Sequence, residues 1–185
     1  METIMVKNRM QLIKERINSK SINGLTHIKL DTFEDHRGEI WTIYSEDYCD
    51  YKFVADKITI SNKGVLRGFH GDPYTAKLIT CLSGKFQLAV VDLREGSQTY
   101  GNVDNFIISD DDPSIVIVPE GCVNAHLCLS EKCVFYYKWS KQYRGPDHQI
   151  TVAWDDPKIG VDWQIEAPIL SERDKHGESY TGQYL

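Results

Sequence analysis

The sequence lacks the long apolar segment that a membrane-spanning helix requires, since none of its apolar runs approaches about 18 residues. It also lacks an excess of basic residues: 21 lysines and arginines stand against 27 aspartates and glutamates, for a net charge of −6. Proteins that bind nucleic acids usually carry a basic surface. These absences argue against membrane and nucleic-acid partners, whereas a few arginines can still create a pocket for a small anion.

Cysteine patterns typical of a disulfide framework or a zinc site are missing as well. The five cysteines form no Cys-x-x-Cys motif, and their odd number argues against complete pairing. Residues 1–20 mix charged residues with short apolar pairs and lack the apolar core of a secretory signal peptide. We therefore expect reduced thiols and a cytoplasmic protein.

Short runs rich in β-branched and aromatic residues dominate the chain up to about residue 155, and turn signals with Gly, Asn, Asp or Pro separate them. This alternation predicts an all-β protein with an antiparallel sandwich or barrel. The expected strands cover residues 40–44, 57–61, 66–70, 77–82, 86–92, 114–118 and 134–139.

The two ends of the chain carry weaker signals. Apolar residues between positions 5 and 20 recur at helical spacing and predict a short helix. The segment from Pro157 onward is expected to cover the body as loops with a short helix. The length and the hydrophobic content of 41% predict a single domain over residues 1–185, with residues 1–24 as an N-terminal extension.

A frame between Gly64 and Gly84 resembles the first motif of the cupin barrels. That motif has a glycine, five residues, His-x-His, a glutamate a few residues later, and a second glycine after six more residues. Here five residues separate Gly64 from His70, and six separate Lys77 from Gly84. Asp72 replaces the second histidine of the motif, and Lys77 replaces its glutamate.

The second cupin motif is matched by Pro119-Glu120-Gly121, with Asn124 where a cupin places its last histidine ligand. A lysine ammonium has three donors and no lone pair, so Lys77 cannot bind a cation and would repel one. Of the expected ligands only His70 survives, although His126 lies nearby in the sequence. We therefore expect no metal, which disfavours a metal-dependent dioxygenase or isomerase.

A set of short motifs covers residues 35–174. The motifs are Asp35-His36-Arg37-Gly38, Val65-Leu66-Arg67-Gly68-Phe69-His70, Lys77-Leu78-Ile79, the run from Val91 to Gly101, Pro119-Glu120-Gly121, Tyr137-Lys138 with Tyr143, Trp154-Asp155-Asp156-Pro157 and Leu170-Ser171-Glu172-Arg173-Asp174. In this order they resemble the dTDP-4-dehydrorhamnose 3,5-epimerase family. The resemblance implies a cupin-type jelly roll, a homodimer with strand exchange, no cofactor, and a nucleotide-linked 4-keto sugar as substrate.

The resemblance also assigns roles to residues of this chain. His70 matches the general base, and Asp174 matches the aspartate that orients it. Tyr137 matches the acid on the opposite face of the sugar, and Lys77 matches the lysine that holds the ketone oxygen. Arg67 and Arg37 match arginines that bind the diphosphate, the latter reaching in from the partner subunit. The full set of expected substrate-binding residues is Arg37, Lys57, Arg67, Asp72, Asn124, His126 and Tyr143.

Several positions depart from the family pattern. Asp72 stands where the family has glutamine, Asn124-Ala125-His126 where it has histidine followed by glycine, and Ala55 and Lys57 where it has other polar contacts. The combination of His70-Gly71-Asp72 with Asn124-x-His126 is more similar to the branch that acts on guanosine-diphosphate-linked 4-keto-6-deoxy sugars or 4-keto-heptoses in capsule synthesis.

These residue types suit enolate chemistry. A proton next to a ketone can be removed because the charge moves onto the oxygen, so the enzyme needs a base, a partner for the oxyanion and an acid on the other face. A neutral histidine such as His70 can take the proton, Asp174 can fix its tautomer, and the cation of Lys77 can meet the enolate oxygen. Tyr137 is a weak acid that does not compete as the base. Arginine binds diphosphates through its planar fork.

Each assignment has a structural alternative. Tyr137 lies in an aromatic run and could belong to the core, Asp174 could be a solvated carboxylate, and His126 could be structural or line the pocket.

Strict strand alternation places Arg67 and His70 on opposite faces. Both can face one pocket only where the strand is irregular, so we predict a break in pairing at Gly68.

Two other functions are compatible with the same scaffold. A 3,4-ketoisomerase would move the carbonyl of the sugar instead of inverting a centre. A catalytically silent cupin would bind the sugar nucleotide for assembly or regulation. The presence together of a base, a lysine that can hold the ketone oxygen and an acid favours the epimerase, which would invert C3 and could also act at C5.

Overall fold

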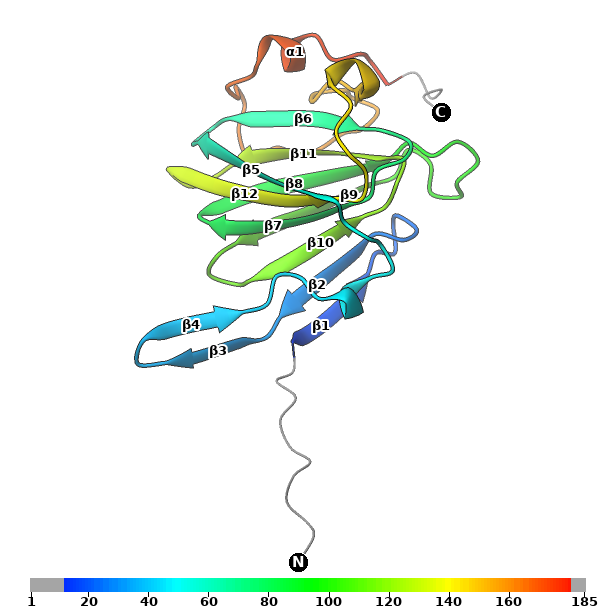
Figure 1. Cartoon of the computed structure of the whole chain (residues 1–185). Coiled ribbons are helices and arrows are strands. Elements are labelled where there is room, and N and C mark those ends of the chain that lie inside the picture. Colours follow the sequence, from blue (N-terminus) through cyan, green and yellow to red (C-terminus); the bar gives the residue numbers. More distant parts are fainter. Residues whose placement is uncertain (1–11, 181–185) are drawn as a thin grey trace, which may run out of the picture.

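The computed structural model describes residues 12–180, which form two antiparallel sheets packed face to face with a small hairpin beside them (Figure 1). The six-stranded sheet has the order β1 (Ile13–Asn18), β2 (Thr26–Leu30), β10 (Ser114–Val118), β7 (Lys77–Ser83), β12 (Lys132–Trp139) and β5 (Ala55–Asn62). The five-stranded sheet has the order β13 (Ile150–Thr151), β6 (Leu66–Gly71), β11 (Cys122–Cys128), β8 (Lys85–Asp92) and β9 (Val103–Ser109). The hairpin pairs β3 (Thr32–Asp35) with β4 (Gly38–Trp41), and the short helices are η1 (Glu46–Tyr48), η2 (Pro146–His148) and α1 (Glu172–Lys175).

The predicted all-β fold and most of the predicted strands are confirmed. The expected helix over residues 5–20 is wrong where it can be compared, because Ile13–Asn18 form β1 and pair with β2; residues 5–11 lie outside the described part. A short isolated helix has little stability of its own, whereas pairing with β2 gives the backbone regular partners. This part of the expected N-terminal extension is therefore an edge strand of the main sheet. The short C-terminal helix is confirmed as α1.

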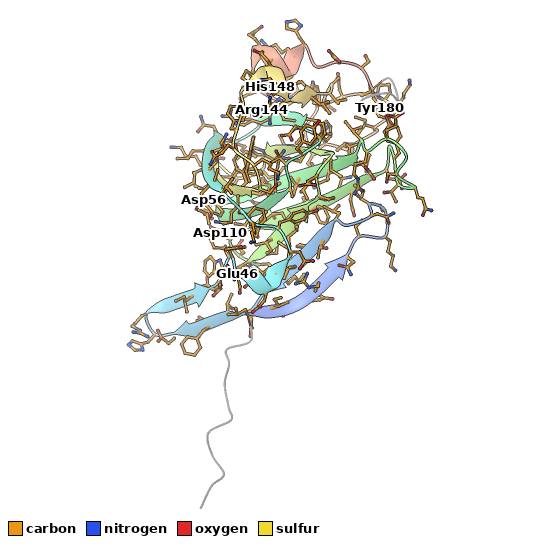
Figure 2. All side chains as sticks on the ribbon, turned by 45° about the vertical axis from the view of Figure 1, so that its right-hand side comes forward. Glu46, Asp56, Asp110, Arg144, His148 and Tyr180 are labelled. Atoms are coloured by element: carbon orange, nitrogen blue, oxygen red, sulfur yellow. The ribbon has the colours of Figure 1, made fainter. Side chains whose placement is uncertain are left out.

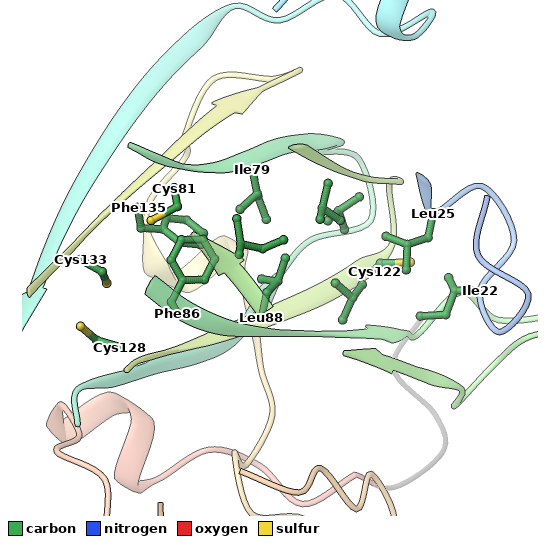
Figure 3. Packing of buried hydrophobic residues seen from close by; sticks show 14 residues of the cluster. Ile22, Leu25, Ile79, Cys81, Phe86, Leu88, Cys122, Cys128, Cys133 and Phe135 are labelled. Atoms are coloured by element: carbon green, nitrogen blue, oxygen red, sulfur yellow. The ribbon is translucent and has the colours of Figure 1, made fainter. Parts of the chain in front are cut away.

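The core lies between the sheets because alternate residues of their strands point inward. Phe86 and Phe135 meet there with ring centroids 5.0 Å apart, and Ile79 and Leu88 pack beside them (Figure 3). A second cluster lies on the outer face of the five-stranded sheet, where the C-terminal segment with Trp163 covers β6, β8 and β11. Both faces of β11 are thus buried, including the polar residues Asn124 and His126 that alternate with its apolar ones.

The predicted break at Gly68 is confirmed. Arg67 pairs with His126 and His70 pairs with Asn124, so three steps along β6 face two along β11. Gly68 has φ of +126°, and a Cβ added there would lie 2.5 Å from the Cβ of Ala125. Only glycine fits this position, and the bulge turns Arg67 and His70 toward the same side of the strand.

No helix in residues 12–180 has the length and apolar content needed to span a bilayer.

Candidate active site

A cavity of about 310 Å³ lies where β5, β6, β7, β11 and β12 meet the C-terminal segment. All predicted site residues line it except Asp72 and Arg37. The lining residues are Lys57, Thr59, Arg67, His70, Lys77, Asn124, His126, Phe135, Tyr137, Trp139, Tyr143, Gln149, Ser171, Arg173 and Asp174. The fold therefore gathers into one space residues that are spread over most of the chain.

His70 and Asp174 form an ion pair in this cavity. The His70 Nε2 atom lies 2.7 Å from the Asp174 Oδ1 atom, and the aspartate side chain is only 3% exposed. Asp174 follows Ser171, whose hydroxyl accepts a hydrogen bond from the Asp174 backbone N–H and begins helix α1. Burial acts to raise the pKa of Asp174, but its contact with His70 outweighs this and lowers the pKa. With Nε2 facing the carboxylate, Nδ1 is left as the ring nitrogen that can take a proton from a ligand.

Lys77 begins β7 with its ammonium group fully buried. Its Nζ donates to the backbone oxygen of His70 over 2.9 Å and to Oδ1 of Asn124 over 2.6 Å. Burial lowers the pKa of Lys77 to about 8, although the negative charge of Asp72 acts in the opposite direction. An ammonium has three N–H donors, so two are held by protein oxygens and one is left for a ligand in the cavity.

Tyr137 lines the cavity from β12 and also packs against the core. Its ring lies edge-on to Phe135 with centroids 5.1 Å apart, and 5.9 Å from the ring of Trp139. Burial raises the pKa of Tyr137, so its hydroxyl keeps its proton at neutral pH. Tyr137 therefore both packs against the core and lines the cavity.

His126 likewise combines packing with a place in the cavity wall. Its ring stacks on Phe135 at 4.0 Å with an interplanar angle of 14°, and its Nε2 has no hydrogen-bond partner within residues 12–180. Burial lowers the pKa of His126 to about 3, helped by the nearby charges of Arg67 and His70. His126 is therefore neutral at physiological pH, and its lowered pKa makes it a weaker base than an ordinary imidazole.

Arg67 and Lys57 place two further cations on the cavity wall. Arg67 Nε donates to the Ser61 hydroxyl over 3.1 Å. The Lys57 Nζ lies 4.1 Å from the ring centroid of Trp139 and 3.7 Å from that of Tyr143. Burial lowers the pKa of Lys57. The anion on the cavity wall, Asp174, already pairs with His70, so the free charge of the cavity is positive although the chain is acidic.

The structure places Asp72 and Arg37 outside this cavity. Asp72 Oδ1 accepts a hydrogen bond from the backbone N–H of Tyr74 in the turn after β6, and Asp72 lines a neighbouring groove. Arg37 occupies the turn between β3 and β4, where its side chain binds Asp35 through Nε and Nη2 and is 76% exposed. This hairpin lies far from α1, which carries Asp174 (Figure 1).

Several lining residues were not predicted from the sequence, among them Thr59, Trp139 and Arg173. Thr59 could have been found, because it lies two residues beyond Lys57 on the same face of a strand. Arg173 could not, because its place depends on how the C-terminal segment returns to the sheet. Among residues 12–180, no three histidine, cysteine or acidic side chains come close enough to hold a metal ion.

Comparisons with known proteins identify relatives of this chain in sequence and in fold. The family described as dTDP-4-dehydrorhamnose 3,5-epimerase matches residues 19–181. A protein of that name from Methanothermobacter thermautotrophicus is 33% identical to the chain, covering 87% of it and 92% of the relative. The crystal structure of such an epimerase from Elizabethkingia anophelis superposes with a TM-score of 0.82 at 32% identity, covering 90% of this chain and 96% of that one. A Legionella pneumophila epimerase solved in complex with dTDP-4-keto-L-rhamnose gives a TM-score of 0.83 at 28% identity, covering 89% and 92%.

Proposed function

The chain belongs to the dTDP-4-dehydrorhamnose 3,5-epimerase family, and we propose that it inverts C3 of a nucleotide-diphospho-4-keto-6-deoxy sugar through an enolate. The observation that carries this proposal is the meeting of the His70–Asp174 pair, the Lys77 ammonium and the Tyr137 hydroxyl around one cavity. C5 also adjoins the ketone, so the same residues can act there.

Each step uses a group whose position is described above. Nδ1 of His70 removes the proton from C3, and Asp174 stabilises the imidazolium that forms. The third N–H of Lys77 meets the enolate oxygen, where a preoriented charge is worth more than in water. Tyr137 then returns a proton from the opposite face, which inverts the centre. No step requires a cofactor, so we expect activity to survive treatment with a chelator.

We further propose that the substrate is a GDP-linked 4-keto-heptose used in capsule synthesis. The support is limited to the departures from the family pattern at Asp72, Asn124 and His126. Asn124 differs chemically from the histidine usual at this position, because its amide oxygen accepts from Lys77.

The decisive experiment is incubation of the protein in heavy water with guanosine- and thymidine-linked 4-keto sugars, with NMR of the products. One deuteron at C3 supports inversion of that centre alone, and deuterons at C3 and C5 support inversion of both. A carbonyl moved to C3 would identify a 3,4-ketoisomerase. No deuterium with any sugar of the panel would contradict the proposed function.

We propose that the active form is a homodimer in which the hairpin of one protomer reaches the cavity of the other. Strand β5 is an edge of its sheet and exposes Ile58 and Ile60, with 60% and 62% of their surface accessible. The hairpin exposes Phe33 and Ile40 beside Arg37. Exposed apolar side chains on a free strand edge are suited to cover by a second copy.

Mixed dimers test whether Arg37 acts on the partner's cavity. Arg37→Glu and His70→Asn are each expected to be inactive as pure dimers. In a mixed dimer one cavity carries both defects and the other carries neither, so remixing should restore about a quarter of wild-type activity by random pairing of two-fold dimers. If Arg37 acted within its own protomer, every mixed cavity would keep a defect and no activity would return.

The five cysteines are all free in the structure. Unpaired thiols are typical of a reducing compartment. We accordingly propose that the protein works in the cytoplasm, where sugar nucleotides are available. Fractionation of the producing cells with detection of the protein by antibody tests this location.

A further inference from the structure

Thr59 and Tyr137 lie on neighbouring strands and both line the cavity. On β5 and β12, which pair antiparallel, Thr59 stands opposite Phe135. The next pair on the same face joins Lys57 to Tyr137. Thr59 is thus the diagonal neighbour of Tyr137, at a separation that an aromatic side chain can bridge. Residues of β5 alternate between the cavity side and solvent, and Asp56 marks this edge strand in Figure 2.

The Thr59 hydroxyl contacts the phenolic oxygen of Tyr137. The Tyr137 ring otherwise packs against the rings of Phe135 and Trp139, which offer no hydrogen bond to a negative charge. Burial raises the pKa of Tyr137, because it disfavours the charged phenolate. The Thr59 hydroxyl is the largest influence that lowers this pKa, ahead of the charge of Arg67.

An acid that gives a proton to carbon carries a negative charge afterwards. In the proposed reaction the O–H bond of Tyr137 breaks and the proton adds to C3, where the carbon–carbon π pair of the enolate becomes the new C–H bond. The ketone forms again, and a phenolate stays on Tyr137 until water protonates it. A phenolate oxygen only accepts hydrogen bonds, so the Thr59 hydroxyl then donates to it. A hydrogen bond to a charged oxygen is stronger than one between neutral groups.

Arg67 gives less of this help once the substrate is bound. Its Nε already donates to the Ser61 hydroxyl over 3.1 Å. In the proposed complex Arg67 also faces the diphosphate, whose negative charge offsets its own. The remaining neighbour, Tyr143, acts with burial and raises the pKa of Tyr137. The hydroxyl of Thr59 is neutral, so the charge of the substrate does not cancel its effect.

We propose that Thr59 is a positioning residue, which holds the Tyr137 hydroxyl in place and stabilises the phenolate left when the proton returns to carbon. The inference rests on the proposed function, because it needs Tyr137 as the acid. It adds a group that acts on the second proton transfer and leaves the first, at His70, unchanged. Thr59 thereby favours inversion of the centre over simple exchange of its proton.

The test compares Thr59→Val, which keeps the shape of the side chain and loses the hydroxyl, with Thr59→Ser, which keeps the hydroxyl. Each variant is incubated in heavy water with the sugar nucleotide that the wild type converts, and NMR gives the early ratio of epimerised to exchanged sugar. Thr59→Val should lower this ratio about tenfold, the scale of one hydrogen bond to a charged group. Thr59→Ser should restore most of the ratio.

Thr80→Val is a matched control on the neighbouring strand β7. The Thr80 hydroxyl donates to the backbone oxygen of Ser114 over 2.7 Å, outside the cavity. This variant also loses a buried threonine hydroxyl and should keep the wild-type ratio. An equal loss in Thr59→Val and Thr59→Ser would assign the effect to packing and overturn the inference.

A double variant tests whether Thr59 acts through Tyr137. In the Tyr137→Phe background Thr59→Val should lower the ratio no further, because the group that it supports is gone. A second tenfold loss in that background, or a wild-type ratio in Thr59→Val alone, would overturn the inference and leave the proposed function standing. A wild-type ratio in Tyr137→Phe would instead remove the acid role of Tyr137, and the inference would fail with it.

Discussion

The ammonium group of Lys77 donates a 2.6 Å hydrogen bond to the side-chain oxygen of Asn124. The cupin pattern assigns both positions to metal ligands, so in this chain a contact between a cation and an amide stands where a metal would be bound. The proposed electrophile of the site is thus a protonated amine. Its charge depends on pH, which a metal ion's charge does not.

Activity should therefore fall as the pH rises above about 8, the value to which burial lowers the pKa of Lys77. Deprotonation removes the charge that meets the enolate oxygen. Lys77→Met should lower kcat by about 10²–10³-fold, as for other single electrostatic donors, and should lose this alkaline limb. A pH profile of kcat for the wild type and for Lys77→Met checks this prediction. An alkaline limb that persists in Lys77→Met would assign the titration to another group.

The same group should affect stability with the opposite sign. The folded protein releases the Lys77 proton near pH 8, and the unfolded chain does so near the ordinary value of 10.5. Between these values the unfolded state binds more protons, so the contribution of Lys77 to stability rises with pH. Urea unfolding from pH 7.5 to about 10.5 should show a larger rise for the wild type than for Lys77→Met. Equal slopes would mean that folding does not lower the pKa of Lys77.

His70→Asn should abolish deuterium uptake from heavy water into the sugar, because no other base is available at that position. Nucleotide binding should stay nearly intact, since the imidazole faces Asp174 and the sugar rather than the diphosphate. NMR of the recovered sugar and calorimetry with the nucleoside diphosphate measure the two effects. Retained exchange would remove His70 from the role of base.

Tyr137→Phe should reduce inversion more than it reduces the first proton exchange. The variant keeps the ring that packs on Phe135 and loses only the hydroxyl, so the base can still form the enolate while the opposite face lacks its acid. The ratio of epimerised to exchanged sugar at early times measures the difference. An equal loss of both would contradict the acid role.

Gly68→Ala should destabilise the fold by about 2–5 kcal/mol, because the added Cβ would overlap Ala125 in a backbone conformation that side chains rarely adopt. Activity should fall as well if the bulge shifts, since it brings Arg67 and His70 to one side. Gly96→Ala is a matched control: Gly96 also has positive φ, but nothing lies within 4 Å of its Cβ position. Chemical denaturation compares the two. Equal destabilisation would show that backbone conformation, not contact with Ala125, sets the cost.

Much of the site could be predicted because its spacing follows strand geometry. His70, Lys77 and Asn124 lie at cupin positions, and the conflict between Arg67 and His70 pointed to the bulge at Gly68. The fold class followed from short apolar runs and turns. Roles for these residues are predictions that the experiments above test.

What could not be predicted depends on long-range packing. Strand β11 is buried on both faces by segments distant in sequence, so its alternation of polar and apolar residues does not mark a solvent-facing side. Strand β1 shows helical spacing, and only its pairing with β2 makes it a strand. Lys57 appeared as a departure from a family pattern, but its place between two aromatic rings required the course of the loop that carries Tyr143.

The C-terminal segment contributes the carboxylate of Asp174 after crossing the outer face of the five-stranded sheet. A ribosome must therefore finish nearly the whole chain before the imidazole of His70 gains its partner. A cut in this segment should lower activity, because Asp174 would no longer be held beside His70, and should lower stability as well, because Trp163 would no longer cover the outer face of the sheet. If Asp174 has its proposed role, activity appears only after the end of the polypeptide has been synthesised and has docked on the sheet.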